Sequence, residues 1–143
     1  MKKYLIVAVL LLGACASNFM GTETYVPIGP QNLSRQVEDS KNMPVFSNPD
    51  QVSRPCSRIA FYQVQRLPND VKVIQREVAK IKELAAKKGA NAIFLKQYVN
   101  EDNRSYPVSL SSYFLKYLDT ITEEDEQKII EFANSAVVSD NAR

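Results

Sequence analysis

The chain has 143 residues, with 18 Lys and Arg against 16 Asp and Glu, and it contains no His and no Trp. This length favours a single domain with a modest hydrophobic core. The absence of His excludes Ser-His-Asp and Cys-His mechanisms and the commonest zinc sites. A formal charge of +2 gives no general argument for nucleic acid as a partner, and we expect none.

The first fourteen residues have the layout of a secretory signal, with two lysines followed by an apolar run at 4–12. That run is far shorter than the ~20 residues that a membrane-spanning helix needs. The sequence Leu-Gly-Ala-Cys at 12–15 resembles the lipobox of bacterial lipoproteins, in which the signal is cut just before a Cys that carries diacylglycerol. The alternatives are an ordinary signal peptide cut at the Gly-Ala pair and an N-terminal membrane helix.

The lipobox resemblance implies that residues 1–14 are removed and that Cys15 is lipidated, so that membrane lipid becomes a partner. Two or three acyl chains bury enough CH₂ groups for stable anchoring, whereas a single chain does not. Residue 16 is Ala rather than Asp, which resembles sorting to the outer membrane in enterobacteria. We therefore expect a lipid-anchored protein at the periplasmic face of the outer membrane, with other envelope proteins as further partners.

Cys56 has no intramolecular partner if Cys15 carries lipid. A solitary Cys in an oxidising compartment is either a quiet, partly buried thiol, a free reactive thiol or half of an intermolecular disulfide. The first is the simplest interpretation, and the other two stay open.

Residues 15–42 are rich in Gly, Pro, Asn, Ser and Thr, which predicts a lipidated flexible tether. A short edge strand at 25–28 is the alternative for part of it. The remaining residues, 43–143, should form a single α+β domain. We expect a short strand at 44–46, a longer central strand at 57–65, and a buried strand at 91–99.

A helix is predicted between 70 and 88, where Asp70 can cap the start and Gly89 can end the last turn. Strand, helix and strand in this order predict a β-α-β unit, or the core of a split one. Residues 108–118 alternate as a strand, with an amphipathic helix as the competing interpretation. We expect the four tyrosines of this later part of the chain to lie in the core with exposed hydroxyls, and an exposed contact patch is the alternative: Tyr98, Tyr106, Tyr113 and Tyr117.

Thr122 and the three acidic residues after it predict the start of a C-terminal helix. Its apolar stripe comprises Ile129, Ile130, Phe132, Ala133, Ala136 and Val137. The acids suit the positive end of a helix, and their spacing does not fit a calcium loop. The whole pattern predicts an α+β fold with a small sheet of about three to four strands, a central β-α-β unit and a C-terminal helix.

Residues 44–98 resemble a group of small bacterial domains that share a short strand, a longer strand, a helix, and a Gly-Ala-Asn-Ala turn into an apolar strand. Here the turn begins with Gly89, Ala90 and Asn91, and its role is structural. The group includes the outer-membrane lipoprotein that senses envelope stress for the Rcs phosphorelay, and cytosolic proteins described as heavy-metal binders. The disulfides of the Rcs sensor have no counterpart here, and without His or a Cys pair we expect no metal site and no cofactor.

No catalytic motif occurs in the chain. The sequence therefore favours a non-enzymatic, lipid-anchored envelope protein that acts as a binding or stress-sensing module. A small periplasmic hydrolase or ligand carrier using carboxylate or Tyr groups is the alternative, and a sensor that depends on Cys56 is a third hypothesis.

Overall fold

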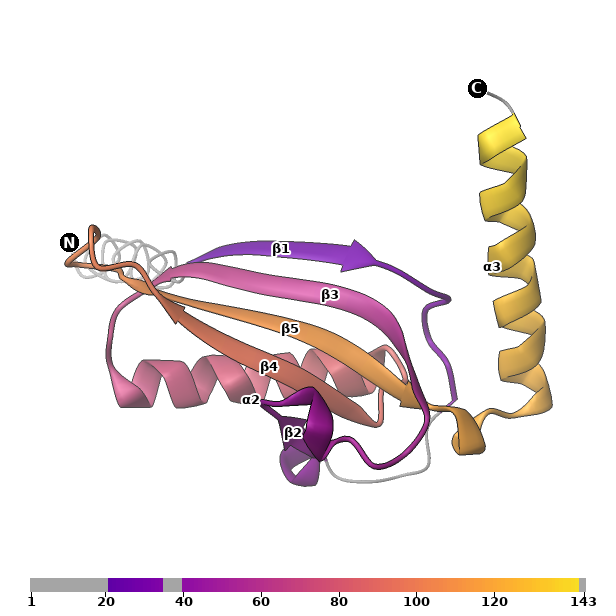
Figure 1. Ribbon diagram of the computed structural model, residues 1–143, viewed down its shortest axis with the longest axis horizontal. Helices are drawn as coiled ribbons and strands as arrows, with labels where there is room; N and C mark the ends of the chain where they lie inside the picture. Colours follow the sequence, from indigo (N-terminus) through magenta and orange to yellow (C-terminus); the bar gives the residue numbers. More distant parts are fainter. Residues whose placement is uncertain (1–20, 35–39, 142–143) are drawn as a thin grey trace, which may run out of the picture.

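The structure, a computed structural model, describes residues 21–34 and 40–141. Its strands are β1 (Thr22–Pro27), β2 (Val45–Phe46), β3 (Cys56–Leu67), β4 (Ala92–Val99) and β5 (Val108–Tyr117). Its helices are α2 (Val71–Lys87) and α3 (Glu123–Asn141), with short 3₁₀ helices at Ser40–Asn42, Pro49–Gln51 and Leu118–Thr120. Figure 1 shows α2 running along the sheet, whereas α3 stands beyond the ends of the strands.

The five strands form one mixed sheet in the order β1-β3-β5-β4-β2. Strand β5 lies between β3 and β4 and is antiparallel to both, so β3 and β4 are parallel to each other. The helix α2 that connects them therefore belongs to a split β-α-β unit. The α+β class and the C-terminal helix are confirmed, but the sheet has five strands instead of the three to four that we expected.

The additional strand is β1, which lies within the segment that we expected to be a flexible tether. It pairs antiparallel with β3 along its whole length, from Thr22 opposite Gln65 to Pro27 opposite Ala60. Further along the same segment, Leu33 is buried in the core. The alternative of an edge strand at 25–28 overlaps β1, which begins earlier and ends at Pro27, and the domain begins well before residue 43. Polar side chains at an exposed edge hid this strand, because they lack the alternation of a half-buried one.

The predicted helix forms as α2, and its capping follows the sequence signals. The Asp70 carboxylate accepts hydrogen bonds from the backbone amides of Lys72 at 2.8 Å and Val73 at 3.2 Å. Gly89 follows the helix in the left-handed conformation, with φ of 87°. The hydrogen bonds to Asp70 satisfy backbone amides that the start of a helix otherwise leaves free.

The core lies between α2 and one face of the sheet. Ile81 and Ala85 of α2 belong to the same buried cluster as Val64 of β3 and Phe114 of β5. A register shift between Arg58 and Ala60 lets two successive residues, Ile59 and Ala60, both reach this cluster. Strand β4 is buried only in its first half, contrary to our expectation, because β2 pairs with just two of its residues and leaves the rest at an edge.

One charged residue of α2 is buried. Glu77 follows the buried-face spacing of Ile74 and Ile81, and its side chain is only 1% exposed. One carboxylate oxygen accepts a hydrogen bond from Lys80 Nζ at 2.9 Å, and the other has no partner among the described residues. Burial, Glu23 and Glu77 together raise the pKa of the Tyr62 hydroxyl, because a second anion in this region is unfavourable.

No helix in the part of the chain that the structure describes has both the length and the apolar character needed to cross a bilayer.

We predict that Gly89→Ala destabilises the fold by more than about 2 kcal/mol. The left-handed conformation alone costs an L-residue roughly 1–2 kcal/mol. A Cβ at this position would also lie 2.1 Å from the Leu33 carbonyl oxygen, so the backbone would have to move. Urea unfolding followed by circular dichroism measures the loss. Gly29→Ala is the matched control, because a Cβ there meets ordinary contacts at 3.5 Å; an equal loss in both variants would contradict the prediction.

Candidate functional site

The residues that the sequence singled out fall in different places. Cys15 and the predicted signal at 1–14 lie outside the described residues. The Gly89-Ala90-Asn91 turn is built for structure. Ala90 is fully buried, and Asn91 Oδ1 accepts hydrogen bonds from Tyr117 N at 2.8 Å and Thr120 Oγ1 at 3.1 Å. Asn91 therefore ties the start of β4 to the end of β5.

The sheet has a second face, opposite α2, that we call the open face. Along β3, Ala60, Tyr62 and Val64 lie in the core with α2, so the alternating residues Phe61 and Gln63 point the other way. Their neighbours on β4 and β5 extend this face. The open face consists of Cys56, Arg58, Phe61, Gln63, Phe94, Lys96, Tyr98, Ser111, Tyr113 and Leu115.

A row of aromatic rings crosses the middle of the open face. Phe61 of β3, Tyr113 of β5 and Phe94 of β4 are direct neighbours in the register of the sheet. The Phe61 and Tyr113 ring centroids are 5.2 Å apart, with the rings tilted by 53°. All three side chains remain partly exposed. Aromatic rings that contact each other across strands stabilise a sheet, and this row also presents a broad apolar surface.

Two cations border the rings. The Arg58 guanidinium lies 4.4 Å from the Tyr113 ring centroid, and Lys96 Nζ lies 5.7 Å from that of Phe94. Cation-π contacts of this kind hold the charged groups near the rings while leaving them accessible. None of the described residues that line the open face is acidic. The face is therefore apolar in the middle and positively charged around it.

A hollow of about 480 Å³ lies at the end of the open face where β3 begins. Cys56 lines it with Arg58, Phe94 and Tyr113. Cys56 is partly buried and forms no disulfide among the described residues. The hollow is continuous with a smaller one of about 300 Å³ over Phe61, because both share the rings of Phe94 and Tyr113.

The tyrosine cluster was only partly assigned correctly. Tyr117 is buried, as expected for a core residue, but Tyr98 is 52% and Tyr106 is 41% exposed. Tyr98 and Tyr113 instead belong to the open face. The sequence contained one signal for this surface, namely strands with apolar residues on both faces. That pattern is equally typical of a sheet covered on both sides, so Phe61, Phe94, Arg58 and Lys96 were missed.

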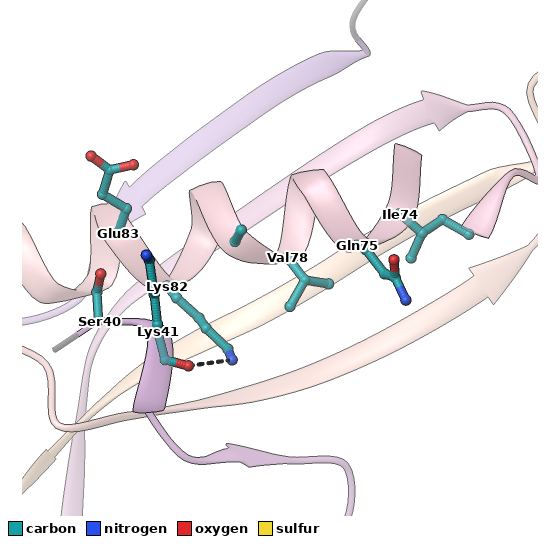
Figure 2. A pocket seen from close by; sticks show the side chains of 8 residues that line it. Ser40, Lys41, Ile74, Gln75, Val78, Lys82 and Glu83 are labelled. Carbon is teal, nitrogen blue, oxygen red and sulfur yellow. Dashed lines mark hydrogen bonds between the residues drawn. The ribbon is translucent and has the colours of Figure 1, made fainter. Parts of the chain in front are cut away.

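A second hollow lies between α2 and the 3₁₀ helix Ser40–Asn42 (Figure 2). Ile74 and Val78 form its apolar side, and Lys82 Nζ donates a hydrogen bond to the Lys41 carbonyl oxygen at 3.3 Å across it. It adjoins residue 40, next to residues 35–39, which lie outside the described part of the chain. We assign no site to it.

The first turn of α3 is fastened to the domain. Asp125 is buried, and its carboxylate accepts hydrogen bonds from Ser34 N at 2.7 Å and Ser34 Oγ at 2.5 Å. The Asp125 amide and Thr122 Oγ1 also bond at 3.2 Å, as in a helix cap. Burial raises the pKa of Asp125. The hydrogen bonds from Ser34 and Thr122 and the charge of Lys116 lower it by a larger amount, so the pKa lies below its ordinary value.

The rest of α3 leaves the domain. From Glu126 to Ala136 no side chain is buried, and Lys128 donates a hydrogen bond to the Asn32 carbonyl oxygen at 3.0 Å. The part of the predicted apolar stripe between 129 and 136 therefore faces solvent, with Ile129, Ile130 and Phe132 exposed by 36%, 51% and 37%. The acids of the first turn serve the helix, and the described residues contain no cluster of three metal-ligating side chains.

The comparisons with known proteins give one weak likeness. No protein-family model matches the chain, and no curated protein matches it. A crystal structure of a Francisella virulence factor, FvfA, in its orthorhombic form is similar at 20% identity, with a TM-score of 0.48. The alignment covers 65% of this chain and 95% of that one.

We predict that Tyr98, at the edge of the open face, adds little to stability. Tyr98→Ser should change the free energy of unfolding by less than about 1 kcal/mol, because Tyr98 is half exposed at a sheet edge. Tyr62→Ser is the matched control in the core and should cost about 3 kcal/mol or more. Thermal and urea unfolding of both variants give the comparison. Similar losses would show that Tyr98 is needed for the fold itself.

Proposed function

We propose that this protein is a lipid-anchored, non-enzymatic binding module of the bacterial cell envelope. Acylated Cys15 would hold it at the periplasmic face of the outer membrane, and the open face would bind a protein partner. The lipobox-like run at 12–15 supports the anchor. A stress-sensing role is compatible with this proposal, since a sensor at the membrane also works by changing its partner.

The open face is the observation that carries the proposal. Soluble proteins rarely leave a contiguous aromatic surface uncovered, and protein interfaces are enriched in Tyr, Phe and Arg. Here the row of Phe61, Tyr113 and Phe94 is bordered by Arg58, and it lies on a regular sheet that needs no change of shape to bind. A rigid surface of this kind loses little conformational entropy on association.

The placement of the carboxylates favours binding over hydrolysis. Asp125 is used by the cap of α3, and Glu77 is buried beside Lys80. No carboxylate lines the hollow at Cys56 among the described residues, although acid-base hydrolysis of the kind we considered needs a pair of such groups. The hollow therefore offers rings, cations and one thiol, which suit recognition.

The anchor can be tested with one substitution. Cys15→Ser should abolish labelling by radioactive palmitate and leave an unprocessed precursor, because the lipid acceptor is missing. Cys56→Ser is the control and should be labelled and processed like the unchanged protein. Membrane fractionation and gel mobility in the native bacterium measure both effects. Normal processing of the Cys15→Ser protein would refute the lipid anchor.

The binding surface can be tested in intact cells. A photo-crosslinking amino acid at Tyr98 should give an adduct with a protein partner, because this side chain lies half exposed on the open face. The same probe at Lys87, on the exposed side of α2, is the control and should give none. Mass spectrometry identifies the adduct. No adduct at Tyr98, or equal adducts at both positions, would contradict the proposed binding surface.

A further inference from the structure

The apolar stripe of α3 needs a cover that the domain does not provide. Ile129 and Phe132 point to solvent on a helix whose first turn is firmly held by Asp125. Exposed apolar residues at this helical spacing are typical of a helix that packs into an apolar groove. The open face is an uncovered apolar surface on the same molecule, and the two surfaces can be compared in size, charge and position.

The sizes of the two surfaces agree. With 19 residues, α3 is roughly 28 Å long at 1.5 Å per residue. The 12 residues of β3, the longest strand of the open face, extend for roughly 40 Å at 3.3 Å per residue. The helix can therefore lie along β3 and over the rings of Phe61 and Tyr113 without extending beyond the end of the strand.

The charges of the two surfaces are opposite. At helical spacing Glu126 of α3 falls on the side of the stripe and Glu123 beside it, whereas Lys128 falls on the other side. The open face presents Arg58 and Lys96 and no acid among its residues. This complementarity favours the open face as the surface for α3, and it disfavours an anionic lipid surface, which would repel the glutamates.

The helix is held away from the open face of its own chain. Lys116 of β5 donates a hydrogen bond to the Ser34 carbonyl, next to the bonds between Ser34 and Asp125. Because Lys116 alternates with Leu115 of the open face, these contacts lie on the opposite side of the sheet, where α2 packs. Reaching its own open face would require α3 to break them.

We infer that α3 of one copy of this chain lies across the open face of a second copy, and that the reverse contact is made at the same time. The result is a two-fold symmetric dimer, in which each copy gives its helix and receives that of the other. This inference rests on the proposed function, since it identifies the protein that the open face binds. The stripe around Phe132 covers the rings, and Glu123 and Glu126 lie against Arg58 and Lys96.

Native Cys56 allows a direct test, because it lies in the hollow of the open face. The full chain carrying Cys15→Ser has Cys56 as its one thiol. Adding Phe132→Cys to it should give a disulfide-linked dimer under mild oxidation, seen on non-reducing gels. Glu131→Cys is the control on the opposite side of α3 and should stay monomeric. Adding Cys56→Ser to Phe132→Cys should abolish the link; a link that persists would join two α3 helices instead and overturn the inference.

Mass measurements give a second readout. The purified Cys15→Ser chain should sediment at twice the mass of one chain, and Phe132→Asp should raise the dimer dissociation constant at least tenfold. Gln127→Asp, on the polar side of α3, should leave it unchanged. Circular dichroism confirms that both variants keep their helix content. If the Cys15→Ser chain without a substitution in α3 sediments at the mass of one chain, the inference is overturned.

These measurements separate the inference from the proposed function, because they do not need the lipid. If the Tyr98 probe captures other envelope proteins and no second copy, the binding function stands and the dimer is refuted. If the purified chain dimerises through Cys56 and Phe132 while Cys15→Ser is processed normally in cells, the dimer stands and the anchor is refuted.

Discussion

The packing of α2 against one face of the sheet determines most of this structure. A sheet has two faces, and a helix that is connected between parallel strands covers the face on its own side. Here Ile81 and Ala85 form the buried contact, and Asp70 and Gly89 fix where the helix begins and ends. The segment of Pro49 and Val52 covers one end of the second face beside Cys56, and the aromatic row of that face remains partly exposed.

The same helix explains the close approach at its end. Gly89 turns the chain beneath the backbone of Leu33, which brings a segment far away in sequence into the core. That segment then holds Asp125 through Ser34 and so fixes the direction in which α3 leaves the domain. The contact of Gly89 with Leu33 and the hydrogen bonds from Ser34 to Asp125 thus link the end of α2 to the start of α3.

Local signals predicted α2 and the C-terminal helix well, because caps, acids and the glycine act within one or two turns. They could not predict the sheet order, since nothing in residues 108–118 states that this strand lies between β3 and β4. The strand β1 was hidden because its exposed Thr and Glu side chains resemble a linker. The burial of Glu77 could not be predicted, because a charged residue normally indicates solvent and only the three-dimensional packing reveals a buried carboxylate.

The open face illustrates a deeper limit. Apolar residues on both sides of a strand indicate that both sides are covered, but a single chain does not say by what. Phe61 and Tyr62 are neighbouring aromatic residues that the sequence alone does not distinguish. Phe61 faces the exterior, whereas Tyr62 lies in the core. The aromatic row therefore became visible only when α2 could be placed on the other side.

The early start of β1 limits how far the domain can stand from a membrane. Six residues, 16–21, separate Cys15 from the first residue of this strand. Fully extended, they span at most about 20 Å, at 3.3–3.6 Å per residue. An acylated Cys15 would therefore keep the domain close to the lipid headgroups instead of letting it reach across the periplasm. Two copies anchored in this way would share one plane, and their encounters would become a search in two dimensions.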